Sequence, residues 1–204
     1  MYIWLFMMGG AAGFVLETLF CLLVHRRLEF RGGLLYLPFN PVYGVGTVLL
    51  TEVLGLLPFQ HAIGYFWVST VLGGCYEYAC SYCQEKVFGT VSWQYNESVG
   101  SIGGRTSVPF ALCWGLLGMV WIMWICPWVR GWADKIGTDL TIIVGLVMLL
   151  DMILSTLAEA RHNQRRRGKA ARGCLARWLD HHYPDAIMER TYPNAVPVAS
   201  VPKA

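Results

Sequence analysis

Long apolar runs, each close to the length that crosses a bilayer, cover most of this chain. The runs lie at about residues 2–24, 42–58, 60–83, 107–129 and 138–160. A helix needs about 20 predominantly apolar residues to span the hydrocarbon core. The pattern therefore predicts an all-α fold, a polytopic membrane helix bundle of about five transmembrane helices. The second run is the shortest and is bounded by Pro41 and Pro58, which favours a tilted, partial or re-entrant segment.

The cations that interrupt this pattern predict its orientation. Of the 16 Lys and Arg residues, 14 follow the first, third or fifth run, and only Arg130 and Lys135 lie between the fourth and fifth runs. The positive-inside rule then places the N-terminus outside and the C-terminus in the cytosol. Only Met1 precedes the first run, so we expect this run to remain as an anchor. These features predict a multi-pass protein of the cytoplasmic membrane.

Composition supports this class of protein. The 204 residues are 55% hydrophobic and 14% charged, whereas soluble domains are about 25% charged. Nucleic-acid binding would need the exposed basic face of a soluble domain, so we expect no nucleic-acid partner.

The expected organisation is a transmembrane domain over residues 1–160 and a basic, largely disordered cytosolic tail over 161–204. Cations crowd the start of this tail, and such clusters attract anionic lipid. The residues expected to contact lipid headgroups are Arg165, Arg166, Arg167 and Lys169. The same cluster also has the composition of a flank that fixes topology. Repeated prolines from residue 184 onward predict disorder.

Four carboxylates lie inside the apolar runs and are candidates for a binding site or polar path: Glu17, Glu52, Glu77 and Asp151. An ionisable group in hydrocarbon costs several kcal/mol unless it is protonated, hydrated or partnered, and such groups commonly mark function. The alternative is that they are protonated or hydrogen-bonded and only hold helices together.

Helical spacing gives two of these acids an inward direction. Gly9 and Gly13 form a G-x-x-x-G whose next i+4 position is Glu17, and Gly73 stands four residues before Glu77. Small residues let helices approach closely, so each acid should share a face with a packing seam. We also expect both acids at a similar depth, toward the cytosol from the middle of their helices.

Two cytosolic segments are too apolar and aromatic for ordinary loops. Residues 31–46 contain two prolines that prevent a continuous helix, and irregular backbone at membrane depth must be covered by protein or line a wet cavity. Residues 84–106 contain Trp93 and Tyr95, which suit either a functional loop or an aromatic belt. Arg105 opens the fourth helix on the same side, and we expect it to pair with Glu17 or Glu77.

Metal, redox and cofactor chemistry have little support in the sequence. The seven cysteines fall mostly within the apolar runs, and Cys80 and Cys83 form a C-x-x-C on the expected cytosolic side. The five histidines are scattered without metal-site spacing. We therefore expect no metal and no cofactor.

Several motifs follow one another in a recognisable order. These are Gly13-x-x-x-Glu17, the run Gly-Leu-Leu-Tyr-x-Pro-x-Asn-Pro-Val-Tyr-Gly-Val-Gly ending at Gly46, Glu77, Trp93-x-Tyr95, Gly104-Arg105 and Trp114-Gly115-Leu-Leu-Gly118. In this order the chain resembles the bacterial family of putative ABC-transporter type IV, or CmpB-like, permeases, over about residues 5–130. The resemblance implies a small component of the inner membrane and adds Asn40, Tyr43, Trp93 and Tyr95 to the binding or path residues. The chain departs from the family pattern at Gln94, where an acid is usual, and at Asn40, where a cysteine or similar residue is usual.

Three functions remain open. The first is a permease-type transport subunit in which intramembrane carboxylates line a path for a cation, a proton or a polar solute. Since no G-x-x-x-x-G-K-[ST] loop occurs, a nucleotide-driven version needs a separate cytosolic ATPase, and the chain is expected to dimerise. The second is a membrane-embedded enzyme on lipid or lipid-linked substrates, although no nucleophile lies beside a base. The third is a non-catalytic membrane partner or sensor.

Overall fold

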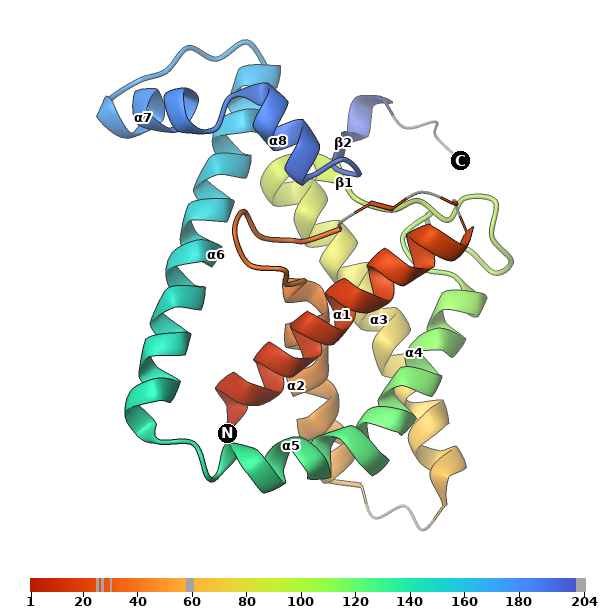
Figure 1. Ribbon diagram of the computed structural model, residues 1–204. Coiled ribbons are helices and arrows are strands. Elements are labelled where there is room, and N and C mark those ends of the chain that lie inside the picture. The colour runs from red at the N-terminus through yellow and green to blue at the C-terminus, as the bar shows by residue number, and fades with distance from the viewer. Residues whose placement is uncertain (25, 27, 30, 58–60, 201–204) are drawn as a thin grey trace.

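The computed structural model describes residues 1–24, 26, 28–29, 31–57 and 61–200. Four helical rods form the main bundle and run alternately between its two ends: α1 (Tyr2–Val24), α2 (Pro41–Gly55), α3 (Ala62–Phe88) and α4 (Val108–Val120). A fifth long helix, α6 (Thr138–Arg166), stands at one side of this bundle (Figure 1). The predicted all-α membrane helix bundle is confirmed.

The apolar runs predict the helix positions closely. Among the described residues, three helical stretches are long and apolar enough to cross a bilayer, namely Tyr2–Val24, Val108–Ala133 and Thr138–Arg166. The shorter α2 has 15 residues, so it is about 22 Å long and does not reach across a hydrocarbon core of about 30 Å. Pro58, expected to bound this segment, lies outside the described residues. Although α3 has 27 residues, it is more polar because it carries Glu77, Gln84, Glu85 and Lys86.

The stretch after α4 changes direction at a proline. A π-helical segment, η1 (Trp121–Ile125), joins α4 to α5 (Cys126–Ala133), and Pro127 lies in the first turn of α5. Proline cannot donate a backbone hydrogen bond and its ring displaces the preceding turn, so a widened turn and a bend are expected there. Figure 1 shows α5 lying across the end of the bundle, where exposed Trp124 and Trp128 suit a membrane interface.

Glycines set the two main helix seams. A Cβ on Gly9 would lie 2.1 Å from Thr47 Oγ1, and one on Gly13 would lie 2.2 Å from the Tyr43 ring, so α1 contacts α2 through these glycines. A Cβ on Gly73 would lie 2.3 Å from Trp114 Cβ in the α3–α4 seam. The seam expected beside Glu17 and Glu77 is therefore present in both helices.

The irregular segment before α2 is covered by α6. The backbone N–H groups of Tyr36 and Leu37 donate to Asp151 Oδ2 at 3.3 and 2.8 Å, and that of Leu35 donates to Ser155 Oγ at 2.9 Å. Asp151 also accepts from Ser155 Oγ at 3.1 Å. Because unpaired backbone groups are costly at membrane depth, these contacts explain how a segment with two prolines can lie against the bundle.

The chain after α6 continues into two further helices. Two short helices, α7 (Cys174–His182) and α8 (Asp185–Thr191), fold back onto α6 (Figure 1). Strand β2 (Val196–Pro197) then pairs antiparallel with β1 (Thr90–Val91), and the turn η2 (Val198–Ser200) follows. Apolar contacts of Ala158 with Leu179, Tyr183 and Met188 form a small core beneath these helices.

Ion pairs hold this tail in place. Arg161 binds both oxygens of Asp180 at 2.8 and 2.7 Å. Arg165 contacts Asp180 at 2.6 Å and Asp185 at 2.7 Å, and His162 Nδ1 contacts Asp185 at 2.9 Å. These ion pairs could not be predicted from the prolines of the tail, because they join Asp180 and Asp185 to residues of α6 that lie far away in sequence.

We predict that Asp180→Asn loosens α7 and α8 at neutral pH, because Arg161 and Arg165 lose the charge they share. Hydrogen exchange in these two helices should accelerate at least about tenfold. The matched control is Glu189→Gln, a change at an exposed residue of α8 that should leave exchange unchanged.

The same contacts fix the pH dependence of the wild-type tail. The hydrogen bond from Arg161 lowers the pKa of Asp180 to about 2, and that from Arg165 lowers the pKa of Asp185. Groups with lowered pKa values stabilise the docked tail fully above the ordinary Asp pKa of about 3.9, and this contribution is lost as pH falls toward about 2. Exchange that accelerates already between neutral pH and about pH 5 would contradict this assignment.

A second prediction concerns the α3–α4 seam. Gly73→Ala should destabilise the bundle by about 1–3 kcal/mol, because the new methyl group meets Trp114 Cβ. Gly55→Ala at the end of α2 is the matched control, since a Cβ there meets no atom within 4 Å. Thermal unfolding in detergent measures the difference, and equal stability of the two variants would contradict the seam.

Candidate functional site

Glu17 lies on α1 where this helix passes the start of α2. Tyr43 of α2 donates its hydroxyl to Glu17 Oε1 at 3.0 Å. Arg31, from the segment before α2, places Nη1 3.8 Å from Glu17 Oε2 and also contacts Glu29 at 3.5 Å. With 27% of its side chain exposed, Glu17 lies at the edge of the bundle rather than at its centre.

Glu77 lies on α3 and is more deeply buried, at 7% exposure. Tyr95 donates its hydroxyl to Glu77 Oε1 at 3.0 Å, and Thr106 donates to Oε2 at 2.9 Å. Both donors come from the connection between β1 and α4. Each oxygen of the carboxylate therefore has a hydroxyl donor, which is what a buried acid requires in apolar surroundings.

The two acids belong to one cluster. Glu17 and Glu77 interact electrostatically with each other, and each also interacts electrostatically with the hydroxyl of Tyr43. Burial raises the pKa of Tyr95, and Glu77 and Glu17 raise it further. Tyr43 stacks on Trp114 with ring centroids 5.4 Å apart, so the indole packs beside the hydroxyl-bearing ring. We call Glu17, Tyr43, Glu77, Tyr95 and Thr106 the acid–hydroxyl cluster.

The connection between β1 and α4 is shaped to direct Tyr95 inward. Gly100, Gly103 and Gly104 all have positive φ, between 57° and 68°, which permits the tight turns of this segment. The backbone N–H of Tyr95 donates to Gly104 O at 2.9 Å, and the Tyr95 ring stacks on Phe110 at 4.1 Å. The glycines that the sequence places before Arg105 thus serve to position a tyrosine.

Trp93 and Asn40, two other residues named from the sequence, have local roles. Trp93 donates its indole N–H to the carbonyl of Arg105 at 2.9 Å. Asn40 caps α2, because its Oδ1 accepts from the N–H of Val42 at 3.1 Å, and its own N–H donates to Gly10 O at 3.0 Å. Both residues support the elements that carry Tyr43 and Tyr95.

The expected pairing of Arg105 with Glu17 or Glu77 is wrong. The Arg105 guanidinium forms an ion pair with Glu85, two turns beyond Glu77 on α3, and donates to Ser81 Oγ at 3.2 Å. It also lies over the rings of Tyr78 and Tyr82, at 5.8 and 5.6 Å. Arg105 therefore pairs with Glu85, an acid of the same helix as Glu77, and the spacing of residues along the sequence could not decide between the two.

The structure does not bring all four intramembrane acids together. Asp151 binds the segment before α2, as described above, and Glu52 is exposed on α2, where it interacts with Tyr2 near the opposite end of the bundle. Across the described ranges, no group of three or more His, Cys, Asp and Glu side chains could hold a metal ion.

Thr106 was not anticipated from the sequence. Its only signal is its place directly after Arg105, at the entry to α4, where a hydroxyl can reach a neighbouring helix. Trp114 was included in a motif without a role. Trp114 packs against Gly73 of α3, and its indole stacks on the Tyr43 ring of α2.

The basic residues expected at lipid headgroups divide into two groups. Arg165 forms ion pairs with Asp180 and Asp185 of the tail, so its charge is already paired within the protein. Arg166, Arg167 and Lys169 are exposed, and Arg166 donates to Ala195 O at 3.0 Å.

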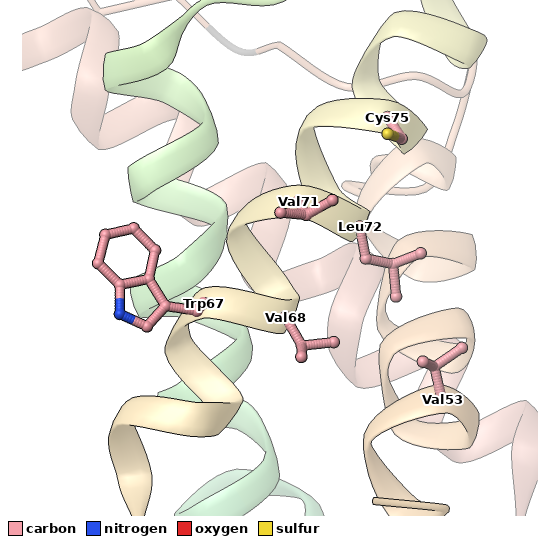
Figure 2. Close-up of a pocket in the computed structure, with 6 residues that line it drawn as sticks. All are labelled: Val53, Trp67, Val68, Val71, Leu72 and Cys75. Carbon is pink, nitrogen blue, oxygen red and sulfur yellow. The ribbon is translucent and has the colours of Figure 1, made fainter.

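An apolar groove of about 470 Å³ lies on the surface of α2 and α3, and none of its lining residues is an acid (Figure 2). Its lining consists of Val53, Trp67, Val68, Val71, Leu72 and Cys75. Trp67 and Val71 are 56% and 67% exposed, as suits side chains that face lipid. The groove offers no polar group for chemistry.

We predict energetic coupling between Arg105 and Glu85. Arg105→Gln and Glu85→Gln should each destabilise the fold, and the double variant should lose about 1 kcal/mol less than the sum of the two single losses. Arg105→Gln combined with Glu77→Gln should be additive. Thermal unfolding in detergent measures both cycles, and coupling to Glu77 in place of Glu85 would contradict the observed pairing.

Comparison with known proteins agrees with the resemblance seen in the motifs. No curated protein and no solved structure matches the chain. The model of the family described as "Putative ABC-transporter type IV" matches residues 4–158, which include the whole acid–hydroxyl cluster. Since this match covers well over half of the chain, the protein belongs to the putative ABC-transporter type IV family.

Proposed function

We propose that this chain is a permease-type transport subunit, multi-pass in a bacterial inner membrane, with Glu17 and Glu77 lining a polar path for a proton or another cation. One observation carries the proposal: two carboxylates of the bundle, Glu17 on α1 and Glu77 on α3, each accept a hydrogen bond from a tyrosine hydroxyl. Family membership supports a role related to membrane transport.

The chemistry of the cluster suits an exchangeable ligand. Two of the side-chain donors to Glu77 are hydroxyls, which can rotate and can accept as well as donate. A cation that enters can therefore replace a donated proton without leaving the carboxylates unpaired. Two nearby acids also attract a shared proton or cation more strongly than one acid does.

A separate cytosolic ATPase would supply the energy, since this chain lacks a nucleotide-binding loop. Segments 25–41 and 84–106 are the proposed contact surface. Exposed apolar side chains there include Tyr36 at 68%, Val99 at 77% and Ile102 at 61%. A second copy of the chain would complete the wall of the path, and membrane lipids surround the rest.

Of the alternatives, a lipid-processing enzyme is less well supported. Such an enzyme would need a cation beside the two acids to bind an anionic headgroup, but Arg105 is paired with Glu85. A purely structural role for the acids is tested by the experiment below.

We predict that Glu77→Gln abolishes transport while leaving the protein folded. The amide keeps the shape and one acceptor for a hydroxyl, but it removes the charge that binds a cation. The complex isolated from its native membrane is reconstituted into vesicles containing a pH-sensitive dye, and proton flux is followed after ATP addition. Flux should fall at least about tenfold.

Glu52→Gln is the matched control, because it removes an intramembrane acid that lies outside the cluster, and its flux should match the wild type. Mass spectrometry of the same preparation should identify a stoichiometric ATPase. Loss of protein rather than of flux in Glu77→Gln would assign the acid to packing, and equal flux in both variants would reject the proposed path.

A further inference from the structure

A cavity with several polar side chains in its lining lies outside the acid–hydroxyl cluster, where the C-terminal ends of α3 and α6 meet the β1–β2 pair. Its volume is about 460 Å³. Glu85 and Gly89 line it from the end of α3, and Asn163, Arg166 and Arg167 line it from α6. Strand β2 closes a further side through Pro197.

Asn163 gives this cavity an unused donor. The residue is only 8% exposed, and its Nδ2 atom is buried with no hydrogen-bond partner among the described residues. A buried amide left unpaired costs about 1–3 kcal/mol, so such groups usually face a ligand or an ordered water. Arg166 and Arg167 follow it by three and four residues, which places all three side chains on one face of the last turn of α6.

The Arg167 guanidinium packs directly against Gly89 in the lining of the cavity. A Cβ on Gly89, whose φ is +68°, would lie 2.0 Å from Arg167 Nη2. A methyl group at residue 89 would therefore displace the Arg167 guanidinium from its present position. No acid in the described part of the chain forms an ion pair with Arg167. The nearest acid of the lining, Glu85, is already paired with Arg105. Glu159 interacts electrostatically with Arg166. Of the two arginines that line the cavity, Arg167 is therefore the one available to a ligand.

We infer that this cavity binds a phosphate group. A phosphate offers several acceptor oxygens, which match the planar guanidinium fork of Arg167 and the amide N–H of Asn163. The carbonyl ends of α3 and α6 each carry only a partial negative charge, which the full charges of Arg166 and Arg167 exceed. At this end of the bundle the group comes either from the headgroup of an anionic phospholipid or from a soluble phosphate.

Native mass spectrometry of the full chain in detergent, titrated with phosphatidylglycerol, tests the inference. One lipid molecule should remain bound, and diacylglycerol, which lacks the phosphate, should not bind. Arg167→Gln should weaken binding at least about tenfold. Gly89→Ala should weaken it too, although it keeps every charge, because the methyl group displaces Arg167.

Arg172→Gln is the matched control, since it removes an exposed cation of the same basic stretch that does not line the cavity. Binding that falls equally in Arg172→Gln and Arg167→Gln would reflect diffuse attraction and overturn the site. If Gly89→Ala does not elute as a folded species, Asn163→Leu replaces it and should also weaken binding.

Inorganic phosphate distinguishes the two sources. Binding of phosphate alone, with the same dependence on Arg167 and Asn163, supports the site and assigns it to a soluble ligand. Binding of phosphatidylglycerol that millimolar phosphate does not displace supports it and assigns it to lipid. Absence of both from the wild-type chain would overturn the inference.

Discussion

A polar group inside an apolar helix bundle must find its partner within the protein, because lipid offers none, and much of this structure follows from that requirement. Glu77 can lie at 7% exposure because the β1–α4 connection brings two hydroxyls to it. The segment before α2 can depart from helical geometry because Asp151 and Ser155 accept its backbone N–H groups. The position of α6 beside the bundle is therefore tied to the shape of a segment more than 100 residues earlier.

Local patterning predicted the parts of the fold that depend on neighbours along one helix. The apolar runs gave the helix positions, and the spacing of Gly9, Gly13 and Glu17 gave an acid on the packed face of α1. Such inferences succeed because residues three or four apart share a face whatever the rest of the chain does. For the same reason Gly73 indicated the face of α3 that meets Trp114.

Local patterning could not predict ion pairs between residues far apart in sequence. Arg105 had several acids within its range, and the choice of Glu85 depends on how the β1–α4 connection turns at its glycines. The order of the tail depends on Asp180 and Asp185, whose bonds to Arg161 and Arg165 appear only when α7 and α8 fold back. The prolines of the tail suggested disorder, whereas Pro184 precedes the first residue of α8 and Pro193 lies in a turn.

The donors to each acid separate structural from functional carboxylates. Asp151 is bound by two backbone N–H groups, which are fixed by the segment that they belong to. A ligand could replace them only by moving that segment, so Asp151 is suited to holding structure. Glu17 and Glu77 are bound by tyrosine and threonine hydroxyls, which can rotate without moving the backbone. Asp151 and Glu77 are both buried, yet an exchange of partners without movement of the backbone is open to Glu77 and not to Asp151. This difference makes the cluster, rather than the number of intramembrane acids, the basis for a polar path.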